Sequence, residues 1–156
     1  MTNFSTRYHT ASIDGLDVFF REAGDRANPT LLLLHGFPSS SHMFRNLIDS
    51  LADAYHLVAP DHIGFGQSSM PSVNQFDYSF DRLTEITEKL IDHLGLDRFA
   101  IYIHDYGAPI GLRIASTRPE KMLGDLHLMG FGCTACGAVL KHDDVEASGD
   151  RLGRTT

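Results

Sequence analysis

Hydrophobic positions along the chain predict an antiparallel hairpin followed by alternating strands and helices. Residues 8–13 and 16–21 flank Asp14-Gly15, a dipeptide typical of a two-residue β-turn. Short apolar runs predict strands near 30–34, 55–59 and 98–103. Helical spacing predicts helices near 40–53, 79–94 and 108–117. This order indicates an α/β fold, in which a mostly parallel sheet carries helices on both faces.

The segment 79–94 has the clearest helical pattern. Glu85 and Lys89 lie one turn apart on its polar face, and Gly95 supplies a stop signal. Its apolar residues share the opposite face: Leu83, Ile86, Leu90, Ile91 and Leu94. The segment is therefore predicted to be an amphipathic helix that covers the sheet.

The pattern changes after about Lys121. Residues 123–129 are compatible with one more strand, but 130–137 holds three glycines and two cysteines without periodicity. The last residues, 142–156, are polar and nearly free of large apolar side chains. We therefore expect a core over residues 1–130 and an irregular, disordered tail over residues 131–156.

The charge balance excludes several classes of partner. The 156 residues carry a formal net charge of −7, with a pI near 5.6 and no basic cluster. Nucleic acids and anionic membranes are bound through clustered Lys and Arg, so neither is an expected partner. No apolar run is long enough to span a membrane, and the first ten residues lack a secretory pattern. The cytoplasm is the expected location.

The two cysteines raise the question of a metal site. Cys133 and Cys136, with His127 and His142, give the spacing His-x5-Cys-x2-Cys-x5-His, whose side chains could ligate a tetrahedral zinc ion. The His-to-Cys spacings match no standard zinc knuckle, and His127 falls in the candidate strand. A redox dithiol is disfavoured because the pair does not open a helix in a thioredoxin-like unit. We therefore expect incidental cysteines and neither a metal nor a cofactor.

Asp105 is the first candidate for chemistry. It lies within Ile-His-Asp-Tyr-Gly, residues 103–107, between a predicted strand and a predicted helix. A sharp strand-to-helix turn drives its central residue towards positive φ and needs a small residue nearby, which Gly107 provides. Aspartate tolerates this left-handed conformation better than most residues. The five residues alone are equally compatible with an ordinary loop aspartate.

Two further segments follow predicted strands. The run 30–34 leads into His35-Gly36-Phe37-Pro38, after which Ser39, Ser40 and Ser41 are candidate N-caps for a helix. The run 57–59 leads into the glycine-punctuated turn 60–68, where Asp61 and His62 are expected to stabilise the turn.

Together, the three segments resemble the α/β-hydrolase family, and in particular its members with an aspartate nucleophile, the epoxide hydrolases and haloalkane dehalogenases. Residues 35–38 are similar to their oxyanion loop, 60–68 to their Pro-Asp-x-x-Gly-x-Gly-x-Ser turn, and 103–107 to their nucleophile elbow. The resemblance covers about residues 6–120. It implies that the chain forms the N-terminal part of an α/β-hydrolase fold.

Two residues depart from the family pattern. Ile103 replaces the first glycine of the elbow, and Tyr106 occupies a position where tryptophan is common. The chain contains no tryptophan. Dehalogenases of the family hold the leaving halide with indole N–H groups, so the resemblance favours an epoxide or a related small electrophile as substrate.

The resemblance also implies a covalent mechanism. The Asp105 carboxylate would open the epoxide, and a histidine-activated water would hydrolyse the resulting alkyl ester. Backbone N–H groups of Phe37 and Tyr106 would form the oxyanion hole. Five residues would support these motifs: His35, Gly36, Pro38, His104 and Gly107. We expect His35 to hold its loop by hydrogen bonds, and His104 to be a poor base because adjacent residues on a strand point to opposite faces.

Tyr102, Tyr106 and the chain length complete these expectations. Tyr102 is expected in the core, whereas Tyr106 is expected at the mouth of the site. An α/β-hydrolase with its cap usually exceeds about 200 residues. This chain ends about fifty residues after Asp105, and no histidine follows a late strand unless His127 or His142 has been repurposed.

The sequence therefore predicts an epoxide hydrolase-like chain that lacks the cap and the catalytic histidine. One alternative is a non-catalytic hydrolase-fold fragment that acts as an interaction module, whose exposed sheet edge pairs with a partner. Separately, the isolated chain is expected to self-associate through its incomplete sheet edge, or to need a partner there, near Leu126 and Leu128. The other alternative is a small zinc-binding protein.

Overall fold

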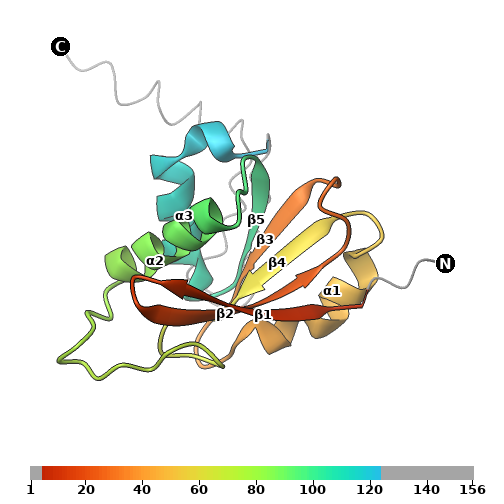
Figure 1. The fold of residues 1–156 in the computed structure, drawn as a ribbon. Helices are drawn as coiled ribbons and strands as arrows, with labels where there is room; N and C mark the ends of the chain where they lie inside the picture. The colour runs from red at the N-terminus through yellow and green to blue at the C-terminus, as the bar shows by residue number, and fades with distance from the viewer. Residues whose placement is uncertain (1–4, 124–156) are drawn as a thin grey trace, which may run out of the picture.

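The computed structural model describes residues 5–123 as a five-stranded sheet with helices on both faces (Figure 1). The strands are β1 (Arg7–Ile13), β2 (Leu16–Ala23), β3 (Thr30–Leu34), β4 (His56–Pro60) and β5 (Phe99–Ile103). They lie in the order β1-β2-β4-β3-β5. Pairing is antiparallel between β1, β2 and β4 and parallel between β4, β3 and β5. The predicted architecture, a hairpin followed by a mostly parallel sheet, is confirmed.

The helical segments also follow the predicted order. They are η1 (Ser41–Phe44), α1 (Arg45–Leu51), α2 (Phe80–His93), α3 (Gly107–Thr117) and η2 (Pro119–Lys121). The helix expected near 40–53 is instead a 3-10 turn followed by a short α-helix. The Ser40 side chain accepts the His42 N–H at 3.3 Å and so caps the 3-10 turn.

Local signals set the ends of the hairpin and of α2. Asp14 and Gly15 have φ angles of 51° and 77°, the two positive values that a tight hairpin turn requires. The Ser79 side chain accepts the Arg82 N–H at 3.2 Å and caps α2. Gly95, with φ of 65°, follows the end of the helix. These residues were predictable because each acts on its own neighbours in sequence.

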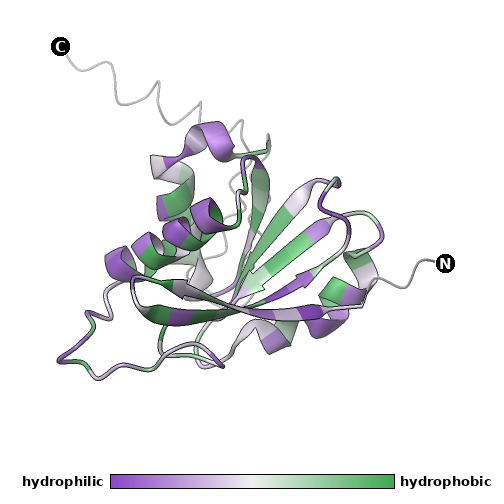
Figure 2. Ribbon diagram, viewed as in Figure 1, coloured by the Kyte–Doolittle hydropathy of each residue, from purple (hydrophilic) through white to green (hydrophobic). Residues whose placement is uncertain are grey.

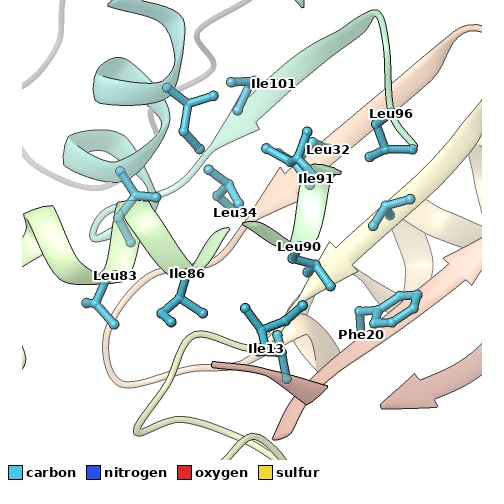
Figure 3. Close-up of a cluster of buried hydrophobic side chains, with 14 of the residues drawn as sticks. Ile13, Phe20, Leu32, Leu34, Leu83, Ile86, Leu90, Ile91, Leu96 and Ile101 are labelled. Carbon is cyan, nitrogen blue, oxygen red and sulfur yellow. The ribbon is translucent and has the colours of Figure 1, made fainter. Parts of the chain in front are cut away.

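The core is divided by the sheet into two clusters. Successive strand residues point to opposite faces, so Leu32 and Leu34 pack against α2 and α3, whereas Leu33 packs against α1. Figure 2 shows hydrophobic residues along the strands and hydrophilic residues on the outer side of α2. Figure 3 shows Leu83 and Leu90 of α2 beside the sheet residues of the larger cluster. Burial of this apolar surface holds the layers together.

A buried polar network joins three strands at the amino ends of the parallel strands. Glu22 accepts hydrogen bonds from His56 Nε2 at 2.9 Å and from Arg26 Nε at 2.8 Å. Thr30 Oγ1 lies 3.0 Å from His56 Nδ1. Burial by itself would raise the pKa of the Glu22 carboxyl, but the hydrogen bonds and positive charges of Arg26 and His56 hold it below its usual range. The network therefore fixes β2, β3 and β4 at the end of the sheet opposite Asp105.

Strand β5 lies at one edge of the sheet. Met122 forms a parallel bridge with Phe99, and the Leu123 N–H donates to Phe99 O at 2.9 Å. A further parallel pairing therefore begins at the outer edge of β5. The rest of the candidate strand 123–129, the boundary at residue 130, the tail 131–156, and the candidate zinc ligands His127, Cys133, Cys136 and His142 lie outside the described residues. Self-association through this edge stays a prediction.

Within residues 5–123, no helix combines the length and apolar character needed to cross a membrane.

Truncation of Leu90 tests the larger core cluster. Leu90 is 1% exposed on α2, so Leu90→Ala is expected to lower the free energy of unfolding by about 2–5 kcal/mol. Leu112 of α3 is 42% exposed, and Leu112→Ala should change it by less than about 1 kcal/mol. Urea unfolding of both variants gives the comparison. Equal losses would show that α2 does not cover the sheet as described.

Candidate active site

Asp105 lies on a sharp turn between strand β5 and helix α3. Its φ is 49°, one of two positive values among the described residues other than glycine. The turn is closed by the Ala108 N–H, which donates to Asp105 O at 2.8 Å, and the His104 N–H ties it to Leu34 O at 3.0 Å. The predicted position of Asp105 at a strand-to-helix turn with positive φ is confirmed.

Two glycines permit the close packing around this turn. A Cβ at Gly107 would overlap the carbonyl oxygen of Leu34, at the end of the adjacent strand β3. A Cβ at Gly36 would overlap the Cβ of Asp105 and lie 2.9 Å from His104 Cδ2. The predicted need for a small residue at 107 is confirmed, and Gly36 meets the same need from the facing loop.

The two oxygens of the Asp105 carboxylate have different surroundings. Oδ1 accepts the Phe37 N–H at 2.9 Å and the Tyr106 N–H at 2.7 Å. No hydrogen bond within residues 5–123 reaches Oδ2. The predicted proximity of the carboxylate to both N–H groups is confirmed. The arrangement fixes one oxygen and leaves the other available to a ligand.

The Phe37 N–H is carried by a loop that two buried histidines support. The His62 N–H donates to His35 Nε2 at 3.0 Å, so that nitrogen carries no proton and His35 Nδ1 donates to Gly36 O at 3.0 Å. His62 Nε2 donates in turn to His35 O at 3.1 Å. The His35 ring thus accepts one hydrogen bond and donates another, which makes it neutral, and the His62 ring donates one in the same network.

Burial explains this protonation state. His35 is fully buried and His62 is 4% exposed. Burial lowers the pKa of His35 below its usual range. For His62, burial together with the nearby His35 lowers the pKa to about 3. The expectation that His35 holds its loop is confirmed. The partnership with His62 was missed, because the two are 27 residues apart. The sequence signal was a histidine within two residues of the end of each of these buried strands.

Asp61 joins the same loop to the glycine-punctuated turn. Its Oδ1 accepts the Ser41 N–H at 2.6 Å and its Oδ2 accepts the Gln67 N–H at 2.9 Å. The Ser68 hydroxyl donates to Asp61 O at 2.7 Å. A Cβ at Gly66 would overlap the Asp61 carboxylate, and Gly66 has φ of 55°. The turn-stabilising role predicted for Asp61 is confirmed, and its carboxylate also holds the start of η1.

Aromatic rings flank Asp105. The Tyr106 ring lies 5.5 Å from Phe37, 6.4 Å from Phe65 and 5.1 Å from Phe80, measured between centroids. Phe37 is 59% exposed and Tyr106 is 39% exposed. These four residues form an aromatic wall, and two of them, Phe37 and Tyr106, also donate their N–H groups to the carboxylate. Phe65 and Phe80 were not predicted as site residues, because their neighbourhood depends on contacts across the fold.

Tyr102 takes the place expected of it, whereas His104 and Asp105 both lie beside Gly36. Tyr102 packs edge-on against Phe44 at 5.7 Å on the α1 face, in the smaller core cluster. No hydrogen bond joins His104, or any other histidine of the described residues, to the Asp105 side chain. The same part of the chain contains no group of three or more His, Cys, Asp or Glu side chains that could hold a metal ion.

Residues 29–130 match the family model described as alpha/beta hydrolase fold. Over 125 residues the chain is 48% identical to an uncharacterized hydrolase of Saccharomyces cerevisiae, covering 80% of this chain and 42% of that protein. A solved haloalkane dehalogenase from Bradyrhizobium elkani is 32% identical with a TM-score of 0.71, and the match covers 76% of this chain and 40% of that chain. A solved epoxide hydrolase from Vigna radiata is 33% identical with a TM-score of 0.68, and the match covers 75% of this chain and 37% of that chain. The chain thus spans 37% to 42% of the length of these relatives.

A methyl group at position 107 tests the close crossing beneath Asp105. Gly107→Ala is expected to lower the free energy of unfolding by about 1–3 kcal/mol, because its Cβ must displace Leu34 or the elbow. Ser116→Ala, on an exposed position of the same helix, should change it by less than about 0.5 kcal/mol. Thermal or urea unfolding measures both. A neutral Gly107→Ala would mean that strand and helix are further apart.

The buried histidines predict a loss of stability in mild acid. The folded-state pKa of His62 lies below that of the unfolded chain, so the unfolded state binds the proton first as pH falls from about 6.5 towards 3. Between pH 7 and pH 5 this histidine alone should remove roughly 2 kcal/mol from the free energy of unfolding. The depressed pKa of Glu22 acts at lower pH, because its contribution is lost as pH falls from the unfolded-state pKa near 4.5 through the lower folded-state pKa.

Urea titrations at pH 7 and pH 5 measure this effect. In His62→Gln, the free energy of unfolding should fall by roughly 2 kcal/mol less between pH 7 and pH 5 than in the unaltered chain. His93→Gln changes an exposed position near the end of α2 and should show the same fall as the unaltered chain. An unchanged pH dependence in His62→Gln would contradict a neutral, buried His62.

Proposed function

Because this chain belongs to the α/β-hydrolase fold family, we propose that Asp105 is the nucleophile of a hydrolase that acts through a covalent alkyl ester. The activity proposed is most like that of an epoxide hydrolase. One observation carries the proposal: two backbone N–H groups hold Asp105 Oδ1 while Oδ2 is left without a hydrogen bond from residues 5–123.

In the first step, Asp105 Oδ2 attacks a carbon of the epoxide. A carbon–oxygen bond forms as the ring carbon–oxygen bond breaks, and the ring oxygen takes the electron pair and then a proton from water. The product is a hydroxyalkyl ester of Asp105. The hydrogen bonds to Oδ1 from Phe37 and Tyr106 favour this step by fixing the direction in which Oδ2 points.

In the second step, water attacks the carbonyl carbon of that ester, and negative charge develops on Oδ1. The two N–H donors already contact this oxygen, so they can stabilise the charge without rearrangement. Loss of one such donor typically slows the reaction by about a hundred- to a thousandfold. A serine nucleophile would need an oxyanion hole facing the substrate carbonyl; here the hole faces the enzyme's own carboxyl group, as an aspartyl ester requires.

The second step also needs a base to activate water. In this fold the histidine of the triad follows the nucleophile in chain order. No histidine among residues 5–123 makes a hydrogen bond to Asp105. The described residues therefore support ester formation and the oxyanion hole, while the base for hydrolysis must come from elsewhere. We expect residues 5–123 to capture an electrophile, and sustained turnover to depend on a base outside them.

The aromatic wall supports an electrophile with an apolar substituent. The exposed rings of Phe37 and Tyr106 lie beside the reacting carboxylate, where hydrocarbon groups gain most from burial. The chain has no indole N–H to hold a leaving halide, since it contains no tryptophan. An epoxide releases no free anion, because its oxygen stays attached to carbon. This difference favours an epoxide over a haloalkane.

Intact-mass analysis tests the proposal. Incubation of the 156-residue chain with styrene oxide should give a single adduct equal to the mass of the whole epoxide, located by proteolysis at Asp105. Asp105→Asn should give none, because a neutral amide lacks the nucleophilic carboxylate. Phenethyl bromide, which would add its alkyl group and lose bromide, should react more slowly.

Asp25→Asn is the matched control. Asp25 is also exposed, and its Oδ1 also accepts a backbone N–H, that of Ala27 at 2.9 Å. This variant should form the adduct at the rate of the unaltered chain. An adduct that persists in Asp105→Asn would refute the assignment of the nucleophile. Continued diol release would mean that a base outside residues 5–123 acts on the ester.

A further inference from the structure

We propose that His35 and His62 are positioning residues, whose reciprocal hydrogen bonds hold the Phe37 N–H against the Asp105 carboxylate. The positioning itself is a property of the fold. Its effect on catalysis rests on the proposed role of Asp105 as nucleophile.

The two donors to Asp105 Oδ1 differ in how they are placed. Tyr106 is the next residue in the same turn, so its N–H is set by the elbow itself. Phe37 is 68 residues away, on the loop that follows β3. Its side chain is largely exposed, so packing of its ring fixes the backbone only weakly. Correct placement of the Phe37 N–H therefore requires support from residues on either side of it.

The histidine pair supplies that support on the β3 side. The His62 N–H donates to His35 Nε2 at 3.0 Å, and His62 Nε2 donates to His35 O at 3.1 Å. The two ring centroids are 4.3 Å apart. These bonds join the loop after β3 to the loop after β4, two residues before Phe37. A buried pair of bonds of this kind restricts the backbone more than one exposed bond would.

The pair can act in this way only while His35 Nε2 is unprotonated. Burial favours the neutral ring in both residues, and the carboxylate of Asp61 and the ring of His104 act on His35 in opposite directions. The Asp61 carboxylate is itself held by the N–H groups of Ser41 and Gln67. At neutral pH the acceptor on His35 is therefore available to His62.

Asp61 should confine the effect of losing the histidine bonds to residues 35–37. Its bond to the Ser41 N–H holds η1 independently of the histidines. Loss of the His35 acceptor should therefore release residues 35–37 while η1 and the elbow remain in place. A general loss of structure would disturb the Tyr106 N–H as well, so the two donors to Asp105 give an internal comparison.

Amide NMR of the full chain tests this positioning. In His35→Asn, which loses the acceptor at Nε2, the Phe37 N–H resonance should move upfield and exchange about ten- to hundredfold faster with solvent. The Tyr106 N–H resonance should keep its position. His35→Gln should restore both properties of Phe37, because its side-chain oxygen can reach the place of Nε2 and accept the His62 N–H. Asp105→Gly identifies the two bonded resonances, since both should move.

A second pair of variants covers the case in which His35→Asn does not fold. His62→Ala removes the donor to His35 O, and His62→Gln can keep it. The Phe37 resonance should move in the first variant and return in the second. An unmoved Phe37 resonance in His35→Asn or His62→Ala, or equal movement of Phe37 and Tyr106, would overturn the proposal. A selective shift of Phe37 supports it even if Asp105 captures no epoxide.

Discussion

The close approach of the Asp105 turn to the end of β3 is the constraint on which the rest of the site depends. The His104 N–H reaches Leu34 O, and neither Gly36 nor Gly107 has room for a Cβ. In this space the chain passes directly from strand to helix and Asp105 takes a φ of 49°. A positive φ outside glycine costs about 1–3 kcal/mol in general, which the packed layers on either side must offset. This conformation places the Asp105 carboxylate at the carboxyl end of the parallel strands.

The two ends of the sheet have different tasks. At the amino ends, Glu22, His56 and Thr30 form a buried network that ties strands together, and both oxygens of the Glu22 carboxylate lie within ion-pair distance of basic side chains. At the carboxyl ends, where open α/β sheets bind their ligands, Asp105 keeps one oxygen free of hydrogen bonds from the described residues. The apolar clusters between the two ends give the sheet the rigidity that a fixed carboxylate requires.

Sequence patterns were sufficient for features that depend on near neighbours. Asp14-Gly15, the Ser79 cap and the elbow at 103–107 all appear where they were predicted, because each is determined within a few residues. Among features that join distant segments, the contact of Asp105 with the Phe37 N–H was expected only through the family resemblance, and the others were not predicted. The His35–His62 pair, the Glu22 network and the place of Phe65 and Phe80 beside Tyr106 depend on how the strands are ordered in the sheet. The fold itself hosts several chemistries, so substrate preference depends on the residues around Asp105.

The central claim is that Asp105 reacts through Oδ2 while Oδ1 stays on the two N–H groups. A crystal structure of the chain after reaction with styrene oxide tests this most directly. We predict a new ester bond at Oδ2, with Oδ1 as the ester carbonyl oxygen still within hydrogen-bond distance of the Phe37 and Tyr106 nitrogens. An adduct on any other side chain, or an ester whose carbonyl oxygen has left both donors, would contradict the account.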